Sequence, residues 1–309
     1  MRLYRTPPTP GALASVRPGV AAIGTFDGLH LGHQAIVGQA RTLAHSNNAR
    51  SIVVSFEPTP AEFFSRDRPP ARLTCFRERA ELLCAAELDE LFCPRFDSVR
   101  AISAEAFVSD LLVGRLGVRQ LVIGHDFRFG AGRQGSLAWL QENGARLGVE
   151  VVPVSPVELD GERISSTAIR AALAAGRLDS AQAMLGRGYS MSGRVVHGRR
   201  LGRDLGFPTA NIRLKRRVAP VDGIFAVRVK GLGNDPLDAV SSVGHRPTIG
   251  GTETLLEVFI FDFAADIYGQ YLHVEFVDRL RGEVRFPDLE SMQAQMSRDA
   301  DAARAALSR

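Results

Sequence analysis

Two histidines stand three residues apart in a short segment that joins an apolar run to a stretch of helical periodicity. The segment reads Gly24-Thr25-Phe26-Asp27-Gly28-Leu29-His30-Leu31-Gly32-His33. Residues three apart share one face of a first helical turn, where backbone amides attract an anion, and Gly32 lets a phosphate approach closely. A single histidine at such a junction is commonly a cap or a packing residue. The paired pattern instead favours a site that stabilises negative charge on a phosphate.

Two further segments of the first half combine residues that suit phosphates and planar rings. Residues 124–135 end a predicted strand and mix glycines and arginines with Phe127 and Phe129, of which alternation places at least one in the core. Residues 164–170 open a predicted helix with three hydroxyls and carry an arginine one turn later. A plain N-cap explains one hydroxyl but not the spacing of the arginine, so we favour a phosphate cradle there.

Residues 55–60 leave another predicted strand. Pro58 and Pro60 predict an extended loop at the carboxyl edge of a sheet, where ligands of open α/β sheets bind. Taken alone the segment is only a proline-rich turn, and the side chain of Thr59 is given no role.

The second half carries oxygen donors and one unusual carboxylate. Residues 193–211 are rich in glycine and arginine and end in Thr209 and Asn211, whose neutral oxygens suit Mg²⁺, an ion that keeps several of its waters. A turn held by Asx-type hydrogen bonds is the alternative for these two residues. Glu257 lies among apolar residues of a predicted strand. From the residues alone, a salt-bridged or edge-strand charge is preferred over a catalytic role for Glu257.

The order of the elements predicts two domains. Through residue 185, short apolar runs alternate with helical stretches, which predicts a parallel sheet covered by helices. The expected strands are 20–24, 51–56, 91–93, 120–124 and 150–154, and the expected helices are 31–47, 76–88, 103–115, 136–147, 167–175 and 179–185. The helical periodicity stops near residues 186–189.

Strand-like runs then dominate, which is the pattern of a small barrel or sandwich. The expected strands are 189–196, 224–229, 239–243, 255–261 and 271–280, and one closing helix follows from residue 288. The predicted domains are therefore residues 1–186 and 187–309.

Composition limits the class of protein. The chain has 309 residues, 45% hydrophobic and 23% charged, which is enough for two cores. Lys and Arg (38) exceed Asp and Glu (34) by four, a balance that suits anionic substrates without indicating nucleic-acid binding. No membrane-spanning run or secretion signal is visible, and three cysteines stand at spacings unlike a metal pair. We expect a cytoplasmic protein with no membrane partner.

The motifs together resemble those of a known enzyme family. Residues 24–33 resemble the His-x-Gly-His signature of the nucleotidyltransferase superfamily, in the Gly-x-Phe-Asp-Gly-x-His form of bacterial FAD synthetases. Residues 193–211, the strand around Glu257 and the turn at 266–269 resemble riboflavin kinases, a family of six-stranded barrels. The resemblance covers about residues 21–299.

The resemblance implies a fold and two reactions. The expected class is α/β: an N-terminal doubly wound, nucleotidyltransferase-like domain, then a small antiparallel β-barrel of the riboflavin kinase type with a closing helix. The implied protein is a bifunctional riboflavin kinase and FAD synthetase (FMN adenylyltransferase). It would phosphorylate riboflavin to FMN and adenylylate FMN to FAD with release of pyrophosphate, using ATP and Mg²⁺.

The resemblance also implies roles for individual residues. His30 and His33 would stabilise charge during attack on the α-phosphorus of ATP, and Glu257 would be the general base that takes the proton of riboflavin. The implied ATP- and phosphate-binding residues are Gly24, Phe26, Asp27, Gly32, Ser165, Ser166, Thr167, Arg170, Gly198, Gly206 and Pro208. Flavin binding would fall to Asp126, Phe127 and Arg128, and Mg²⁺ binding to Thr209 and Asn211. Ser242 and His245 stand where relatives often carry Asn and Thr, so the contacts of that loop stay open.

Two other functions are alternatives to a flavin enzyme. A nucleotidyltransferase with another acceptor, such as phosphopantetheine or a phosphocholine-like alcohol, would have no use for a riboflavin-kinase-like barrel. A barrel that binds RNA through its basic residues would be expected to carry aromatic stacking residues, which the sequence lacks. The basic residues concerned are Arg194, Arg199, Arg200, Arg203, Lys215, Arg216 and Arg217.

Overall fold

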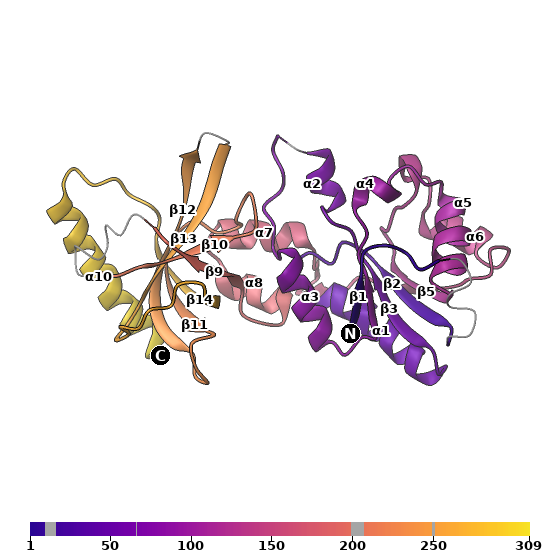
Figure 1. Ribbon diagram of the computed structural model, residues 1–309, viewed down its shortest axis with the longest axis horizontal. Coiled ribbons are helices and arrows are strands. Elements are labelled where there is room, and N and C mark those ends of the chain that lie inside the picture. The colour runs from indigo at the N-terminus through magenta and orange to yellow at the C-terminus, as the bar shows by residue number, and fades with distance from the viewer. Residues whose placement is uncertain (10–16, 66, 199–206, 249–250) are drawn as a thin grey trace. The chain divides into compact units, whose positions relative to one another are not determined.

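The protein packs as two compact units (Figure 1). The structure is a computed structural model that describes residues 1–9, 17–65, 67–198, 207–248 and 251–309, with the backbone alone for 245–248 and 251–253. The first unit comprises Met1–Pro70 and Arg79–Ser165, and the second comprises Ala71–Glu78 and Ser166–Arg309. The division between them crosses helix α3 (Phe76–Ala85) between Glu78 and Arg79.

The first unit is built on a parallel sheet of six strands in the order β1-β4-β3-β2-β5-β6. Strands β2 and β3 are buried along their whole length, as expected of parallel strands covered on both faces. The strands are β1 (Arg2–Tyr4), β2 (Gly19–Ile23), β3 (Arg50–Val54), β4 (Glu90–Phe92), β5 (Val118–Gly124) and β6 (Glu150–Val154). A separate hairpin joins β7 (Glu158–Leu159) to β8 (Glu162–Arg163).

Helices cover both faces of this sheet. Helix α1 (Leu31–Ser46) buries Val37, Ala40 and Ala44, which the helical repeat places on one side. Alternate strand residues such as Ala21 and Ile23 pack into the core formed with the segments around Phe107 and Leu140. The remaining helices of the unit are α2 (Pro60–Phe64), α4 (Phe96–Val99), α5 (Ala104–Ala106), the π-helix η1 (Phe107–Arg115), the 3₁₀ turn η2 (Ala131–Arg133) and α6 (Leu137–Asn143).

The second unit is a closed barrel of six antiparallel strands in the order β10-β13-β12-β11-β14-β9. Residues that alternate along each strand, such as Ile212, Val227 and Val258, fill the interior. The outward-facing Val240 and Phe259 pack with the closing helix. The elements are α7 (Ser166–Ala174), α8 (Leu178–Leu185), β9 (Ser190–Val196), β10 (Ala210–Leu214), β11 (Gly223–Lys230), β12 (Leu237–Thr248), β13 (Gly251–Ile260), β14 (Tyr271–Arg281) and α10 (Leu289–Leu307).

The predicted fold class is confirmed: a parallel α/β domain is followed by a closed antiparallel barrel and a C-terminal helix. Several elements differ from expectation: β1, β7, β8 and α4 were not predicted, and the expected helix 103–115 divides into α5 and η1. Two further differences concern the predicted motifs. Pro60 was placed in an extended loop but begins helix α2, because proline fits the first turn of a helix, where its missing N–H has no intrahelical partner. Strand β10 was not expected, because its first two residues, Ala210 and Asn211, belong to the motif that ends at Asn211.

Helices α7 and α8 pack in the core of the second unit. Ile169, Leu173 and Leu185 belong to the same buried cluster as the barrel interior, and so does Leu73 of the 71–78 segment. The predicted domain boundary between residues 186 and 187 lies where the helical periodicity of the sequence stops, and it stays a prediction.

Candidate active sites

The 24–33 loop connects β2 to α1 by a backbone that turns sharply. Phe26, Gly28 and Leu29 have φ angles of 50°, 82° and 39°, in the left-handed region that non-glycine residues rarely adopt. The Phe26 side chain is fully buried, and a Cβ atom on Gly24 would lie 3.1 Å from its ring. Strained positions of this kind persist where the surrounding packing holds them, and they cluster at functional sites.

The loop brings His30 and His33 together. Their rings stack with centroids 3.6 Å apart and an interplanar angle of 18°, and the ring of Phe26 meets His33 edge-on at 5.3 Å. The backbone N–H of His33 donates to Nδ1 of His30 at 3.3 Å, so His30 is the N-cap of α1. Since Nδ1 accepts a hydrogen bond, Nε2 carries the proton of the neutral ring. Capping therefore uses Nδ1 of His30, and Nε2 is a hydrogen-bond donor.

The other predicted residues of this loop are also close to the histidines. Asp27 is buried, and it stands between Phe26 and Gly28, whose φ angles are both in the left-handed region. A Cβ atom on Gly32 would lie 3.2 Å from the His30 ring and 3.9 Å from the Ile164 carbonyl oxygen. Gly32 therefore makes room for the His30 ring, a reason for glycine that differs from the one expected. The same contact places the chain just before Ser165 beside the first turn of α1.

The 55–60 segment ends in a capped helix. Thr59 Oγ1 accepts from the backbone N–H of Glu62 at 3.3 Å, and Glu62 Oε2 accepts from the backbone N–H of Thr59 at 3.1 Å. This reciprocal pair is a capping box. Thr59, which received no role from the sequence, therefore defines where α2 begins.

The aromatic residues of the 124–135 segment divide between core and surface. Phe129 is buried, as alternation required of at least one of the pair, and Phe127 stacks on it with centroids 5.6 Å apart. Asp126 and Arg128 are exposed, and Asp126 forms an ion pair with Arg163. The structure thus gives Asp126 a protein partner that the sequence did not indicate.

The 164–170 segment divides between the two units. Ser165 closes the first unit, and α7 begins at Ser166 in the second. In the second unit, Arg170 Nε donates to the Ala71 carbonyl oxygen at 2.5 Å. Part of the Arg170 guanidinium therefore anchors the 71–78 segment.

In the barrel, strand register aligns three polar residues. Glu257 on β13 pairs directly with Ser242 on β12 and with Asn211 on β10. Directly paired residues share one face, and the alternate residues Leu256 and Val258 point into the interior. The row of Ser242, Glu257 and Asn211 therefore lies on the outer surface of the barrel.

Two further predicted residues, Gly198 and Thr209, lie next to Asn211 of this row, Gly198 in space and Thr209 in the chain. A Cβ atom on Gly198 would collide with the Asn211 side chain, so the glycine lets the chain pass close to Asn211. Thr209 immediately precedes β10 and is half-buried, whereas Pro208 is exposed. Gly206, also predicted to bind phosphate, lies outside the described residues.

A cavity of about 450 Å³ opens beside the row, between the barrel wall and α10. This volume is typical of small-molecule sites. Half of the lining residues are apolar or aromatic. The polar ones form one group at Thr209, Ser241, Ser242 and Glu257, and the charged Arg281, Glu283, Arg285 and Asp299 complete the lining. Ser241 is 2% exposed, and its Oγ has no hydrogen-bond partner among the described residues. The full lining is Phe207, Thr209, Ile224, Val240, Ser241, Ser242, Glu257, Phe259, Arg281, Glu283, Val284, Arg285, Phe286, Met292, Met296 and Asp299.

The contribution of the closing helix was not predicted from the sequence. Asp299 accepts two hydrogen bonds from Arg281, at 2.8 and 2.6 Å, and this bidentate pair fixes α10 beside the cavity. Asp299 lies four and eight residues before the buried Ala303 and Leu307. The sequence could have indicated this role, because helical periodicity places the charged Asp299 on the apolar face of the predicted helix.

The donor set of the row fits a hard cation. Thr209, Asn211 and Glu257 offer hydroxyl, amide and carboxylate oxygens, which Mg²⁺ prefers. Among the residues that the structure describes, no three His, Cys, Asp or Glu side chains gather as a metal site. An ion here would therefore depend on these oxygens together with phosphate oxygens and water.

Comparison with known proteins identifies the family. The model of the FAD synthetase family matches residues 13–168, and that of the riboflavin kinase family matches residues 185–307. The bifunctional riboflavin kinase/FMN adenylyltransferase of Escherichia coli is 45% identical over 281 residues, covering 91% of this chain and 90% of the relative. This chain belongs to that family. The predicted family and function are thereby confirmed.

Two other proteins extend the likeness. The bifunctional riboflavin kinase/FMN adenylyltransferase of Pseudomonas fluorescens is 44% identical, covering 93% of this chain and 92% of the relative. A crystal structure described as a macrolide-efflux protein from Streptococcus pneumoniae superposes with a TM-score of 0.82 at 29% identity, covering 98% of this chain and 99% of that one. In the described parts of this chain, no helix is both long and apolar enough to cross a membrane.

Proposed function

We propose that each unit carries the principal groups of one reaction. Riboflavin becomes FMN at the barrel row of Ser242, Glu257 and Asn211, and FMN becomes FAD at the 24–33 loop. The observation that carries the first assignment is that Glu257, Thr209 and Ser242 line one cavity of about 450 Å³. The second assignment is supported by the stacked histidines at the start of α1.

In the kinase reaction, the apolar and aromatic lining holds the flavin ring and leaves its ribityl chain near the polar group. Glu257 takes the proton of the 5′-hydroxyl as that oxygen attacks the γ-phosphorus of ATP, and ADP leaves. Thr209 and Asn211 would hold Mg²⁺, which would supply positive charge to offset the negative charge of the phosphates.

In the adenylyltransferase reaction, a phosphate oxygen of FMN attacks the α-phosphorus of a second ATP. The bond from the α-phosphorus to the bridging oxygen breaks, and pyrophosphate leaves. His30 and His33 donate hydrogen bonds to the phosphate oxygens on which charge develops, so no covalent intermediate with the protein is needed. Ser165, Ser166, Thr167 and Arg170 hold the remaining phosphates, and Asp126, Phe127 and Arg128 hold the flavin.

We also infer a cytoplasmic location and a boundary between the two activities near residue 186. The three cysteines are free thiols, which agrees with a cytoplasmic location. The residues needed for FMN formation begin near residue 187, and those needed for FAD formation end near residue 186. ATP and flavins are the partners, and nucleic acid and membrane are not.

The test is to incubate the purified full chain with riboflavin and ATP, with and without Mg²⁺, and to separate the flavins by chromatography. FMN should appear first and FAD after it, and supplied FMN should yield FAD without riboflavin. Excess chelator should stop both steps. A chain that binds RNA tightly but forms neither flavin product would contradict the proposal.

A further inference from the structure

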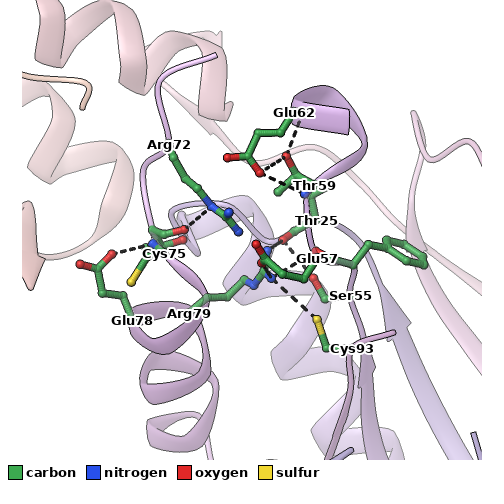
Figure 2. Close-up of polar contacts among 12 residues, drawn as sticks. Thr25, Ser55, Glu57, Thr59, Glu62, Arg72, Cys75, Glu78, Arg79 and Cys93 are labelled. Atoms are coloured by element: carbon green, nitrogen blue, oxygen red, sulfur yellow. Dashed lines mark hydrogen bonds and ion pairs between the residues drawn. The ribbon is translucent and has the colours of Figure 1, made fainter. Parts of the chain in front are cut away.

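Arg79 is a charged side chain with no exposed surface, and it lies between two loops of the first unit (Figure 2). Its Nη1 donates to the Thr25 carbonyl oxygen at 2.9 Å. Its Nη2 donates to the Phe56 carbonyl oxygen at 3.2 Å and to Glu57 Oε2 at 2.9 Å, and it lies 3.8 Å from Cys93 Sγ. One guanidinium therefore contacts the segment after β2 and the segment after β3.

The two segments are also joined to each other at Thr25. Ser55 Oγ donates to the same Thr25 carbonyl oxygen at 3.1 Å, and the backbone N–H of Gly24 donates to the Val54 carbonyl oxygen at 3.1 Å. Thr25 immediately precedes Phe26, where the backbone enters the left-handed region. The position of this carbonyl therefore sets the start of the turn that leads to His30 and His33.

A planar guanidinium suits this task because its donors diverge at fixed angles. Lysine offers a single point charge and cannot hold both segments with the same geometry. Burying the charge is expensive, and Glu57 offsets it across a 2.9 Å ion pair. Since replacing both members of a buried ion pair by apolar side chains is often neutral or stabilising, stability alone does not account for the Arg79–Glu57 pair here.

We infer that Arg79 is a positioning residue for adenylyl transfer, holding the 24–33 loop and the 55–59 segment at a fixed separation. Arg79 has no exposed surface, so it acts through the two segments and does not touch the substrate. The inference rests on the proposed function of the 24–33 loop. It concerns Arg79 and residues 56–57, which lie outside the 24–33 segment that resembles the His-x-Gly-His signature.

The central variant is Arg79→Met, which keeps the length and apolar volume of the stem and removes the donors. We expect the turnover rate for FAD formation from supplied FMN to fall by about 100-fold, the scale reported for small misplacements of reacting groups. FMN formation from riboflavin, measured in the same preparation, should stay at the parent rate. Arg79→Lys should recover part of the lost rate, since it restores the charge opposite Glu57 and a donor group, without the planar fork of the guanidinium.

A matched control is Arg41→Met. Arg41 is an arginine of the same unit that pairs with Glu87 at 3.0 Å but is half-exposed on α1. It should keep both rates. Amide hydrogen exchange supplies a readout besides activity: in Arg79→Met, residues 25–33 and 56–59 should exchange faster, whereas β2 and β3 should keep their protection.

The outcomes separate the inference from the function on which it rests. Parent turnover and unchanged exchange in Arg79→Met would overturn the positioning role, and so would an equal loss of both activities, which indicates general unfolding. His30→Ala in the same assay tests the loop itself. If His30→Ala loses FAD formation while Arg79→Met does not, only the positioning inference fails. If His30→Ala keeps it, the loop assignment fails.

Discussion

The 24–33 loop and the barrel row place their polar groups by different means. In the loop, His30 and His33 follow a turn in which three of the four residues 26–29 have left-handed φ angles. The buried side chains of Phe26 and Arg79 support this turn. In the barrel, strand register sets the position of Glu257 opposite Ser242 and Asn211. The geometry of the loop depends on contacts with residues distant in the chain. The position of a strand residue is instead held by all the paired residues of the two neighbouring strands. Substitutions near the loop should therefore act at longer range than those in the barrel.

The largest expected effect concerns Glu257. Glu257→Gln keeps the size of the side chain but cannot accept the proton, so riboflavin phosphorylation should fall by about 10²- to 10⁴-fold. Folding and FAD formation from supplied FMN should be preserved. Both rates are measured in one preparation with the melting temperature recorded. A merely structural carboxylate would give a lower melting temperature with near-normal turnover, which would leave the base unidentified.

Single substitutions His30→Ala and His33→Ala should lower FAD formation by about 10²- to 10³-fold, because each removes a preorganised donor. FMN formation should continue at the parent rate. His30→Asn would sharpen the result, because asparagine also caps helices and so separates capping from charge stabilisation. Parent rates in both alanine variants would show that the loop does not serve this reaction.

A pair of fragments tests how far the barrel depends on its helices. The fragment of residues 166–309 retains α7 and α8, whose Ile169 and Leu173 are buried in the barrel core, and the fragment of residues 185–309 does not. The shorter fragment should be less stable by about 2–5 kcal/mol or more, the usual cost of losing one large buried side chain. Urea unfolding compares the two. Equal midpoints would show that α7 and α8 add little to the second unit.

The smallest effect concerns thiol reactivity. Burial raises the pKa of Cys75 and of Cys93, each in a different unit, so both thiols are less ionised near pH 8 than an ordinary cysteine. Cys84 is exposed. A thiol reagent should label one group quickly and two slowly in the native protein, and Cys84→Ser should remove the fast phase. Rapid labelling of all three would show that one core opens readily.

Sequence predicted the elements of this fold well where a strand or helix carries its own periodicity. Strand β6 and helix α1 are examples, and the paired imidazoles could be predicted because their three-residue spacing is local. The buried role of Arg79 could not, since its partners lie 54 and 22 residues away and its neighbourhood in the chain is that of a charged helix surface. Similarly, α2 could not be predicted from the sequence, because Pro60 is compatible both with a loop and with the first turn of a helix.

The passage of the chain from the first unit to the second and back has a consequence for synthesis on the ribosome. Glu78 belongs to the second unit, where it accepts hydrogen bonds from Ser192 and pairs with the buried Arg216, which follows 138 residues later in the chain. At about 5–20 residues per second, translation separates the two side chains by about 7–28 s. During that interval Arg79 can already form its hydrogen bonds to Thr25 and Glu57, both of which have been synthesised. The neighbouring Glu78 carboxylate stays hydrated until Arg216 has been synthesised.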